Sequence, residues 1–151
     1  MKRTLTAIAG LFLFGCLASP AVAQVHGAKI VDDAWVAAMK AGNVDAVVAL
    51  YAPDAVLYAP DDMQARGTAA IRAGYTSMLS GMTITEAVID AQYQTVGDLS
   101  VGFGTATLTM VPKSGGSPTQ MTVRVTDVAR KIGGKWLYVA DHASVPAGPG
   151  K

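Results

Sequence analysis

The sequence predicts an α+β domain in which helices come first and a run of antiparallel strands follows. Between residues 28 and 79, apolar residues recur at steps of three and four, which is the period of amphipathic helices. From Thr83 onward, Val, Ile, Thr and aromatic residues alternate with polar ones, and glycine-rich turns separate four such stretches. A strongly twisted sheet of this kind is expected to curl around the helices as a cone with an apolar interior.

Three helices are expected in the first half of the domain, over residues 28–41, 44–51 and 68–79. Gly42 suits the C-terminal cap of the first helix, and the side chain of Asn43 can cap the second. The second helix is expected to carry its buried stripe as far as Tyr51, before Pro53 ends it. Thr68 is the expected cap of the third helix.

The strands are expected to form one mostly antiparallel sheet. A short strand is predicted over Ala55–Ala59, followed by a turn at residues 60–62. Four longer strands then follow, over residues 83–96, 100–111, 120–131 and 135–145. The turns between them are rich in Gly, Asp, Ser and Pro, which is the chemistry of hairpin connections, and residues 147–151 form a tail.

The first 23 residues have the layout of a secretory signal peptide. Lys2 and Arg3 precede an apolar run, and the small residues Ala21 and Ala23 lie at the −3 and −1 positions of a cut before Gln24. The apolar run is short for a membrane span, which needs about 20 residues. We therefore expect a protein that is periplasmic or secreted and is not held in a membrane after cleavage.

A lipoprotein route is the alternative reading of the same segment. Cys16 follows Leu13-Phe14-Gly15, which loosely resembles a lipoprotein cleavage box, although the bulky Phe14 fits that box poorly. Cleavage after Ala23 removes Cys16, the only cysteine, so the exported protein is expected to lack an intrachain disulfide.

The charge of the chain excludes some partners. Loss of Lys2 and Arg3 changes the formal net charge from +1 to −1, and the rest of the chain has no run of basic residues. A near-neutral domain gives no electrostatic reason to expect binding to nucleic acid or to an anionic membrane. His26 and His142 are the only histidines, and no cluster of metal-ligating residues is visible, so neither a metal nor a cofactor is predicted.

Three segments resemble those of a known superfamily. Residues 41–56, AGNVDAVVALYAPDAV, are similar to a recurring signature of the nuclear transport factor 2-like superfamily, with its cystatin-like fold. Gly67-Thr68-Ala69-Ala70-Ile71 resembles the opening of the third helix of that superfamily. Residues 135–144, KWLYVADHAS, look like the last strand of its SnoaL-like and SgcJ/EcaC-like branches. The resemblance extends over residues 28–146 and implies a cone-shaped domain with a pocket between sheet and helices, commonly dimeric through the sheet.

Ketosteroid isomerase has this fold, but its catalytic residues do not match this chain. The position of its carboxylate base, before a proline at the end of the first strand, is Ala59 here. In the most natural register, the carboxylic acid of its oxyanion hole falls on Arg124, and its tyrosine falls on or near Trp35. Without a base and a neutral acid donor, proton abstraction by that mechanism is excluded.

His142 is the candidate catalytic residue, because a histidine pKa lies near neutrality. By the two-residue period of a strand, His142 shares a face with Tyr138 while Asp141 points the other way. If that face lines the pocket, His142 is a general acid or base or orients a ligand. In the alternative reading it makes a structural hydrogen bond.

The candidate ligand-binding residues are Trp35, Tyr58, Arg124, Tyr138 and His142. Tyr58 lies beside the missing base and is expected at the pocket mouth, with a polar tip on an aromatic body. Arg124 either binds a carboxylate or carbonyl of a ligand, or faces solvent, or pairs with Asp127, Glu86 or Asp90.

Three functions are compatible with this sequence. The first is an exported domain that binds a small apolar or carbonyl-bearing molecule. The second is an isomerase, cyclase or hydrolase that acts on a carbonyl compound with His142. The third is a dimerising structural or inhibitory module with a vestigial pocket. A fold shared by such different proteins does not decide between them.

Overall fold

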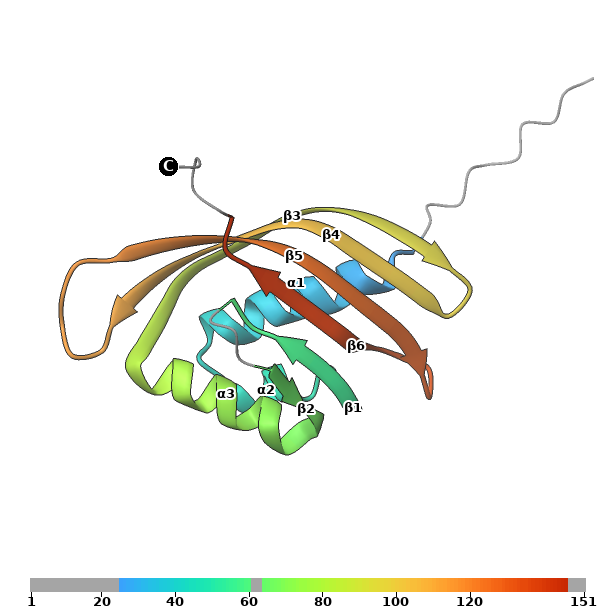
Figure 1. Ribbon diagram of the computed structural model, residues 1–151, viewed down its shortest axis with the longest axis horizontal. Coiled ribbons are helices and arrows are strands. Elements are labelled where there is room, and N and C mark those ends of the chain that lie inside the picture. Colours follow the sequence, from blue (N-terminus) through green and yellow to red (C-terminus); the bar gives the residue numbers. More distant parts are fainter. Residues whose placement is uncertain (1–24, 61–63, 147–151) are drawn as a thin grey trace, which may run out of the picture.

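A computed structural model of the protein describes residues 25–60 and 64–146 (Figure 1). The predicted signal peptide with Cys16, two residues of the predicted turn at 60–62, and the predicted tail at 147–151 lie outside the described residues. The described chain is α+β, as predicted: three helices pack on the concave face of one curved sheet.

The helices are α1 (Gly27–Lys40), α2 (Val44–Val48) and α3 (Gly67–Gly81). The side chain of Asn43 accepts a hydrogen bond from the backbone N–H of Ala46, so Asn43 caps α2 as predicted. Gly27 allows α1 to approach the last strand, because a Cβ atom there would lie 2.1 Å from the indole ring of Trp136. No helix in the described part of the chain is long and apolar enough to cross a membrane.

The six strands are β1 (Tyr51–Tyr58), β2 (Gln64–Arg66), β3 (Met82–Val96), β4 (Leu99–Pro112), β5 (Thr119–Ile132) and β6 (Lys135–Ser144). Their order in the sheet is β2-β1-β6-β5-β4-β3. All neighbours are antiparallel except β1 and β6, which run parallel. Figure 1 shows β3, β4 and β5 as long curved strands that arch over α1, while α3 lies beneath the other end of the sheet.

Tyr51 belongs to β1 and not to the second helix, so the predicted end of that helix is wrong. The backbone N–H of Tyr138 donates to the carbonyl of Leu50 at 2.8 Å, and Tyr51 is paired with Tyr138 of β6. Parallel pairing with a strand almost ninety residues away outweighs the helical period of this short apolar stretch. Tyr51 is thereby placed on the sheet, with its ring in the core.

A β-bulge in β6 changes which residues face the helices. Val128 is paired with Ala140 and Ala129 with Tyr138, so Val139 is an extra residue in β6. An extra residue inverts the alternation of side chains beyond it. As a result Tyr138 and Asp141 are both buried on the concave side, although they are three residues apart.

Candidate ligand cavity

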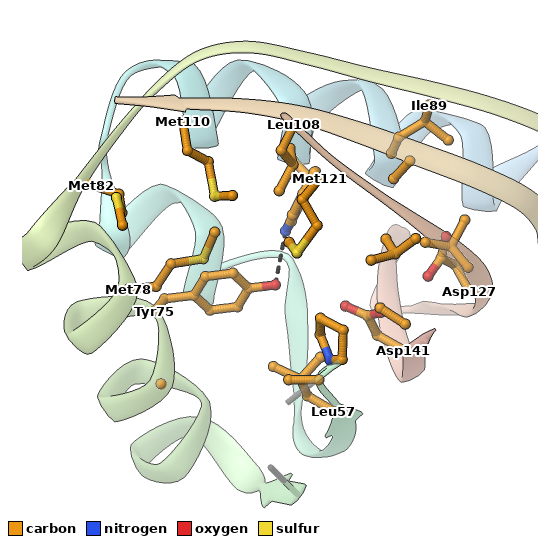
Figure 2. A pocket seen from close by; sticks show the side chains of 18 of the residues that line it. Leu57, Tyr75, Met78, Met82, Ile89, Leu108, Met110, Met121, Asp127 and Asp141 are labelled. Atoms are coloured by element: carbon orange, nitrogen blue, oxygen red, sulfur yellow. Dashed lines mark hydrogen bonds between the residues drawn. The ribbon is translucent and has the colours of Figure 1, made fainter. Parts of the chain in front are cut away.

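A cavity of about 520 Å³, partly open to solvent, lies between the sheet, α1 and α3. Its walls are mostly apolar and come from β1, β3, β4, β5, β6 and the two helices (Figure 2). Four methionines line it: Met78, Met82, Met110 and Met121. Unbranched thioether side chains adapt to ligands of different shape, which makes this part of the wall compliant.

Two aspartates form the polar end of the cavity. Asp127 of β5 and Asp141 of β6 are direct cross-strand partners, and both line the cavity with exposed fractions of 4% and 9%. In Figure 2 both lie on the side of the cavity away from Met82 and Met110. The cavity is therefore apolar along most of its length and acidic at one end.

The acid pair holds a proton at neutral pH. Burial, together with the neighbouring charges of Asp141 and Asp32 and a hydrogen bond to Asp141, raises the pKa of Asp127 to about 9. Burial also raises the pKa of Asp141, against the lowering effect of hydrogen bonds from Tyr51 and Asp127. Because Asp141 accepts hydrogen bonds from both the Tyr51 hydroxyl and Asp127, the proton of the pair lies on Asp127 and Asp141 is the carboxylate.

A relay of hydrogen bonds leads to Asp141 from α1. The indole N–H of Trp35 donates to the hydroxyl of Tyr75 at 2.9 Å, and the hydroxyls of Tyr75 and Tyr51 are 2.7 Å apart. The Tyr51 hydroxyl donates to the carboxylate of Asp141. Because each tyrosine has a single proton, Tyr75 must donate to Tyr51, and the whole relay points toward Asp141.

A second buried carboxylate lies behind the cavity wall. Asp32 of α1 is 1% exposed and accepts hydrogen bonds from Tyr138 at 2.6 Å and from Tyr93 at 2.9 Å. Burial raises the pKa of Asp32, while the two hydrogen bonds lower it. A Cβ atom on Gly102 would lie 2.9 Å from the ring of Tyr93, so the glycine provides the space that Tyr93 occupies.

Two of the predicted ligand-binding residues, Trp35 and Tyr138, line the cavity. Trp35 begins the relay, and Tyr138 separates the cavity from Asp32. Neither placement tests whether these residues bind a ligand, so their roles stay predictions.

His142 and Arg124 lie on the outer face of the sheet, where both are exposed. The predicted face of His142 is wrong because the bulge at Val139 turns Asp141 inward and His142 outward. Arg124 alternates with Val123 and Val125, which line the cavity, so its guanidinium points away from the interior. The predicted register that put Arg124 at a pocket position is therefore wrong, and the inward-facing polar residue of β5 is Asp127.

Tyr58 lies outside the large cavity and beside His142. Its ring and that of His142 meet edge to face with centroids 6.2 Å apart, and its hydroxyl accepts a hydrogen bond from Gln64. Both residues line a second hollow of about 310 Å³ on the outer side, next to Ala59 and Pro60. Ala59 lines the large cavity as well, where its methyl group cannot accept a proton.

The sequence contains a signal for one residue of the acid pair. Asp127 continues the inward alternation of Val123 and Val125, so the period-two pattern places it inside. Asp141 had no such signal, because the pattern of β6 predicts the opposite face until the bulge is known. For Asp32 the sequence signal is weak, because the exposed Asp33 follows it on the same helix. Only its place next to the buried residue Val31 indicates that Asp32 is buried.

The chain belongs to a known family of domains. The profile of the SnoaL-like domain family matches residues 33–139, more than half of the chain, and the protein belongs to this family. The predicted membership of the nuclear transport factor 2-like superfamily is confirmed. No curated protein shows a significant sequence match to the chain.

Solved structures with the same fold carry different functional names. A candidate calcium/calmodulin-dependent protein kinase II association domain from Xanthomonas campestris is 29% identical, with a TM-score of 0.73 over 85% of this chain and 91% of its own. A ketosteroid isomerase-like protein from Erwinia carotovora is 21% identical, with a TM-score of 0.70 over 80% and 95%. A candidate dehydratase of the nuclear transport factor 2-like family from Streptomyces avermitilis is 18% identical, with a TM-score of 0.65 over 80% and 94%. The last two likenesses show the fold alone.

Proposed function

We propose that this protein is exported and binds a small, largely apolar molecule in the cavity of its cone. The observation that carries this proposal is the cavity itself, about 520 Å³ with an apolar wall that ends in a buried acid pair. Ligand sites typically have this form: a concave apolar space with a few polar groups that fix orientation. A domain with a vestigial pocket would be expected to fill such a space with side chains, since protein interiors are close-packed.

A pair of alanine substitutions tests the proposal. Ala106→Phe places a ring in the cavity, because Ala106 is buried and lines it, whereas Ala37→Phe places the same ring on the exposed side of α1, away from the cavity and the sheet. Native mass spectrometry of protein purified from the periplasm is expected to show a bound molecule with the wild type and Ala37→Phe, and none with Ala106→Phe. The same preparation is expected to begin at Gln24. Absence of any adduct, together with no thermal shift across a metabolite library, would count against binding.

A second candidate function is acid–base catalysis on such a ligand, as in an isomerase, cyclase or hydrolase acting on a carbonyl compound. The observation that favours it is the protonated Asp127 that donates to Asp141, since a carboxylic acid beside a carboxylate can serve as acid and base. His142, the residue first expected in this role, lies on the other face of the sheet. Any turnover should then be lost in Asp141→Asn and kept in His142→Ala.

We also propose that the outer face of the sheet forms a homodimer. Val88 and Phe103 are 60% and 37% exposed there. Asp90 and Arg124 lie in one cross-strand row on either side of Thr105, and neither makes an ion pair within the described residues. A two-fold axis through this row would bring Arg124 against Asp90 of the partner subunit. Sedimentation should show a dimer, which Arg124→Asp weakens and Asp90→Arg in the same chain restores.

A further inference from the structure

The polar end of the cavity accepts hydrogen bonds and has no side-chain donor to spare. The indole N–H of Trp35 is used by Tyr75, and the hydroxyl protons of Tyr75 and Tyr51 are used along the relay to Asp141. Tyr138 donates to Asp32, and the proton of Asp127 is directed to Asp141. Among the described residues that line the cavity, Ser77 is the only other side-chain donor, and it is exposed on α3.

The same end carries negative charge, and among the described residues the one cation that acts on it, His142, lowers the pKa of Asp141 from the other face of the sheet and does not line the cavity. None of the described residues that line the cavity is Lys, Arg or His. Asp141 is the charged member of the pair, and Asp32, behind Tyr138, acts on Asp127 through its charge. A buried carboxylate with no counter-charge beside it in the cavity is costly, so a cation that enters the cavity would relieve that cost.

Three aromatic residues line the same cavity, and a fourth packs behind two of them. Trp35, Tyr75 and Tyr138 line the cavity, and the ring of Tyr51 lies 5.1 Å from that of Tyr138 and 6.0 Å from that of Tyr75. The faces of such rings attract ammonium groups, and desolvation strengthens the attraction.

From these three observations we infer that the ligand is a cationic amine with an apolar body, whose ammonium group donates hydrogen bonds to Asp141 and Asp127 while its body lies against the methionines. A carbonyl oxygen at this end could accept only the proton of Asp127, which Asp141 already accepts, and a carboxylate would be repelled. The inference rests on the proposed binding function and replaces the carbonyl group that the sequence led us to expect.

Four probes that share one apolar body and differ in their polar group test which polar group the cavity prefers. Naphthylethylamine, naphthylethanol, naphthylacetone and naphthylacetate share an apolar ring system and differ in charge and donors. Calorimetric titration of the wild-type protein should show the amine binding about tenfold or more tightly than the alcohol and the ketone, as a charge-assisted hydrogen bond provides. The acetate should bind most weakly.

Asp141→Asn should reduce the affinity for the amine to that for the alcohol. Asp54→Asn is the matched control, because it removes one exposed carboxylate of β1 away from the cavity and should leave the preference intact. The comparison among the four probes uses the wild type alone, so it does not depend on the folding of a variant.

Equal or tighter binding of the ketone, or an amine preference that survives Asp141→Asn, would overturn the amine inference and leave the binding function standing. If none of the four probes binds, the amine inference fails, and the adduct measurement on periplasmic protein decides the binding function separately.

Discussion

At the scale of single residues, the most informative feature is the direction of the relay from Trp35 to Asp141. Every hydroxyl in it has one acceptor and one donor, so the orientation of each proton is fixed by its neighbours. The relay stabilises negative charge on Asp141 at the cavity surface. In this way α1, α3 and β1 together set the electrostatics of a site whose charged residue lies on β6.

Tyr75→Phe should weaken the fold by interrupting this relay. It leaves the indole N–H of Trp35 without its acceptor and the hydroxyl of Tyr51 without its donor, and a buried polar group without a partner costs about 1–3 kcal/mol. Tyr58→Phe is the control, because the Tyr58 hydroxyl is exposed and accepts only from Gln64. Urea unfolding should show a clear loss for Tyr75→Phe and almost none for Tyr58→Phe. Equal stabilities would mean that the relay contributes nothing.

The acid pair should make the protein less stable as the pH rises. Because burial raises the pKa of Asp127 to about 9, the folded state binds a proton that the unfolded state, with a pKa near 3.8, has released. The resulting stability is fully present below the unfolded pKa and is lost as the pH rises toward the folded pKa. Asp141 and Asp32 shift in the same direction.

Asp127→Asn should flatten this dependence, because an amide cannot lose the proton. Urea unfolding of the wild type and the variant, at pH values between 3.8 and about 9, measures how the free energy of unfolding of each changes with pH. The variant should be the more stable of the two toward the alkaline end. A wild type whose stability rises toward pH 9 would contradict the assignment of the proton.

The sequence could locate some of these residues and not others. Alternation on β5 was sufficient to place Val123 and Val125 inside and Arg124 outside once the cavity side was known. It failed on β6, because the bulge at Val139 leaves no mark in a pattern of mixed small and apolar residues. The relay could not be predicted from the sequence, because its four residues lie on four elements that only the tertiary fold brings together.

At the scale of elements, the long strands were the most predictable part of the fold. Strands β3 to β6 begin and end within one or two residues of their predicted bounds, because long alternating stretches and glycine turns are strong signals. The short elements depended on tertiary contacts. The three-residue strand β2 was not predicted, and β1 begins at Tyr51 because β6 provides a parallel partner.

Gly104 should be essential for the pairing of β3 with β4. A Cβ atom there would lie 2.1 Å from the carbonyl oxygen of Asp90 and 2.6 Å from the Cα of Ala91, and backbone atoms cannot move aside as a flexible side chain does. Gly104→Ala should therefore cost about 1–3 kcal/mol of stability, the range for overpacked positions. Gly81→Ala is the control, because a Cβ there meets nothing within 4 Å. Thermal unfolding that does not distinguish the two would show that the strands separate at little cost.

At the scale of the whole molecule, the cone divides its cavity into two chemically different regions. One region is lined by methionines that can rearrange, and the other is an acid pair held by hydrogen bonds from three elements. Compliance at one end and fixed polarity at the other are suited to ligands with a variable apolar body and a constant polar group. We expect the cavity to select its ligand by the polar group.

The methionine methyl groups provide the most direct test of the central claim that a ligand occupies this cavity. Met78, Met82, Met110 and Met121 line it, whereas Met39 is fully buried in the core and does not line it. In a methyl NMR titration with naphthylethylamine, the four cavity methyl signals should shift to a common saturation point while that of Met39 stays in place. Unmoved cavity signals, or a Met39 signal that moves as far as they do, would contradict the claim.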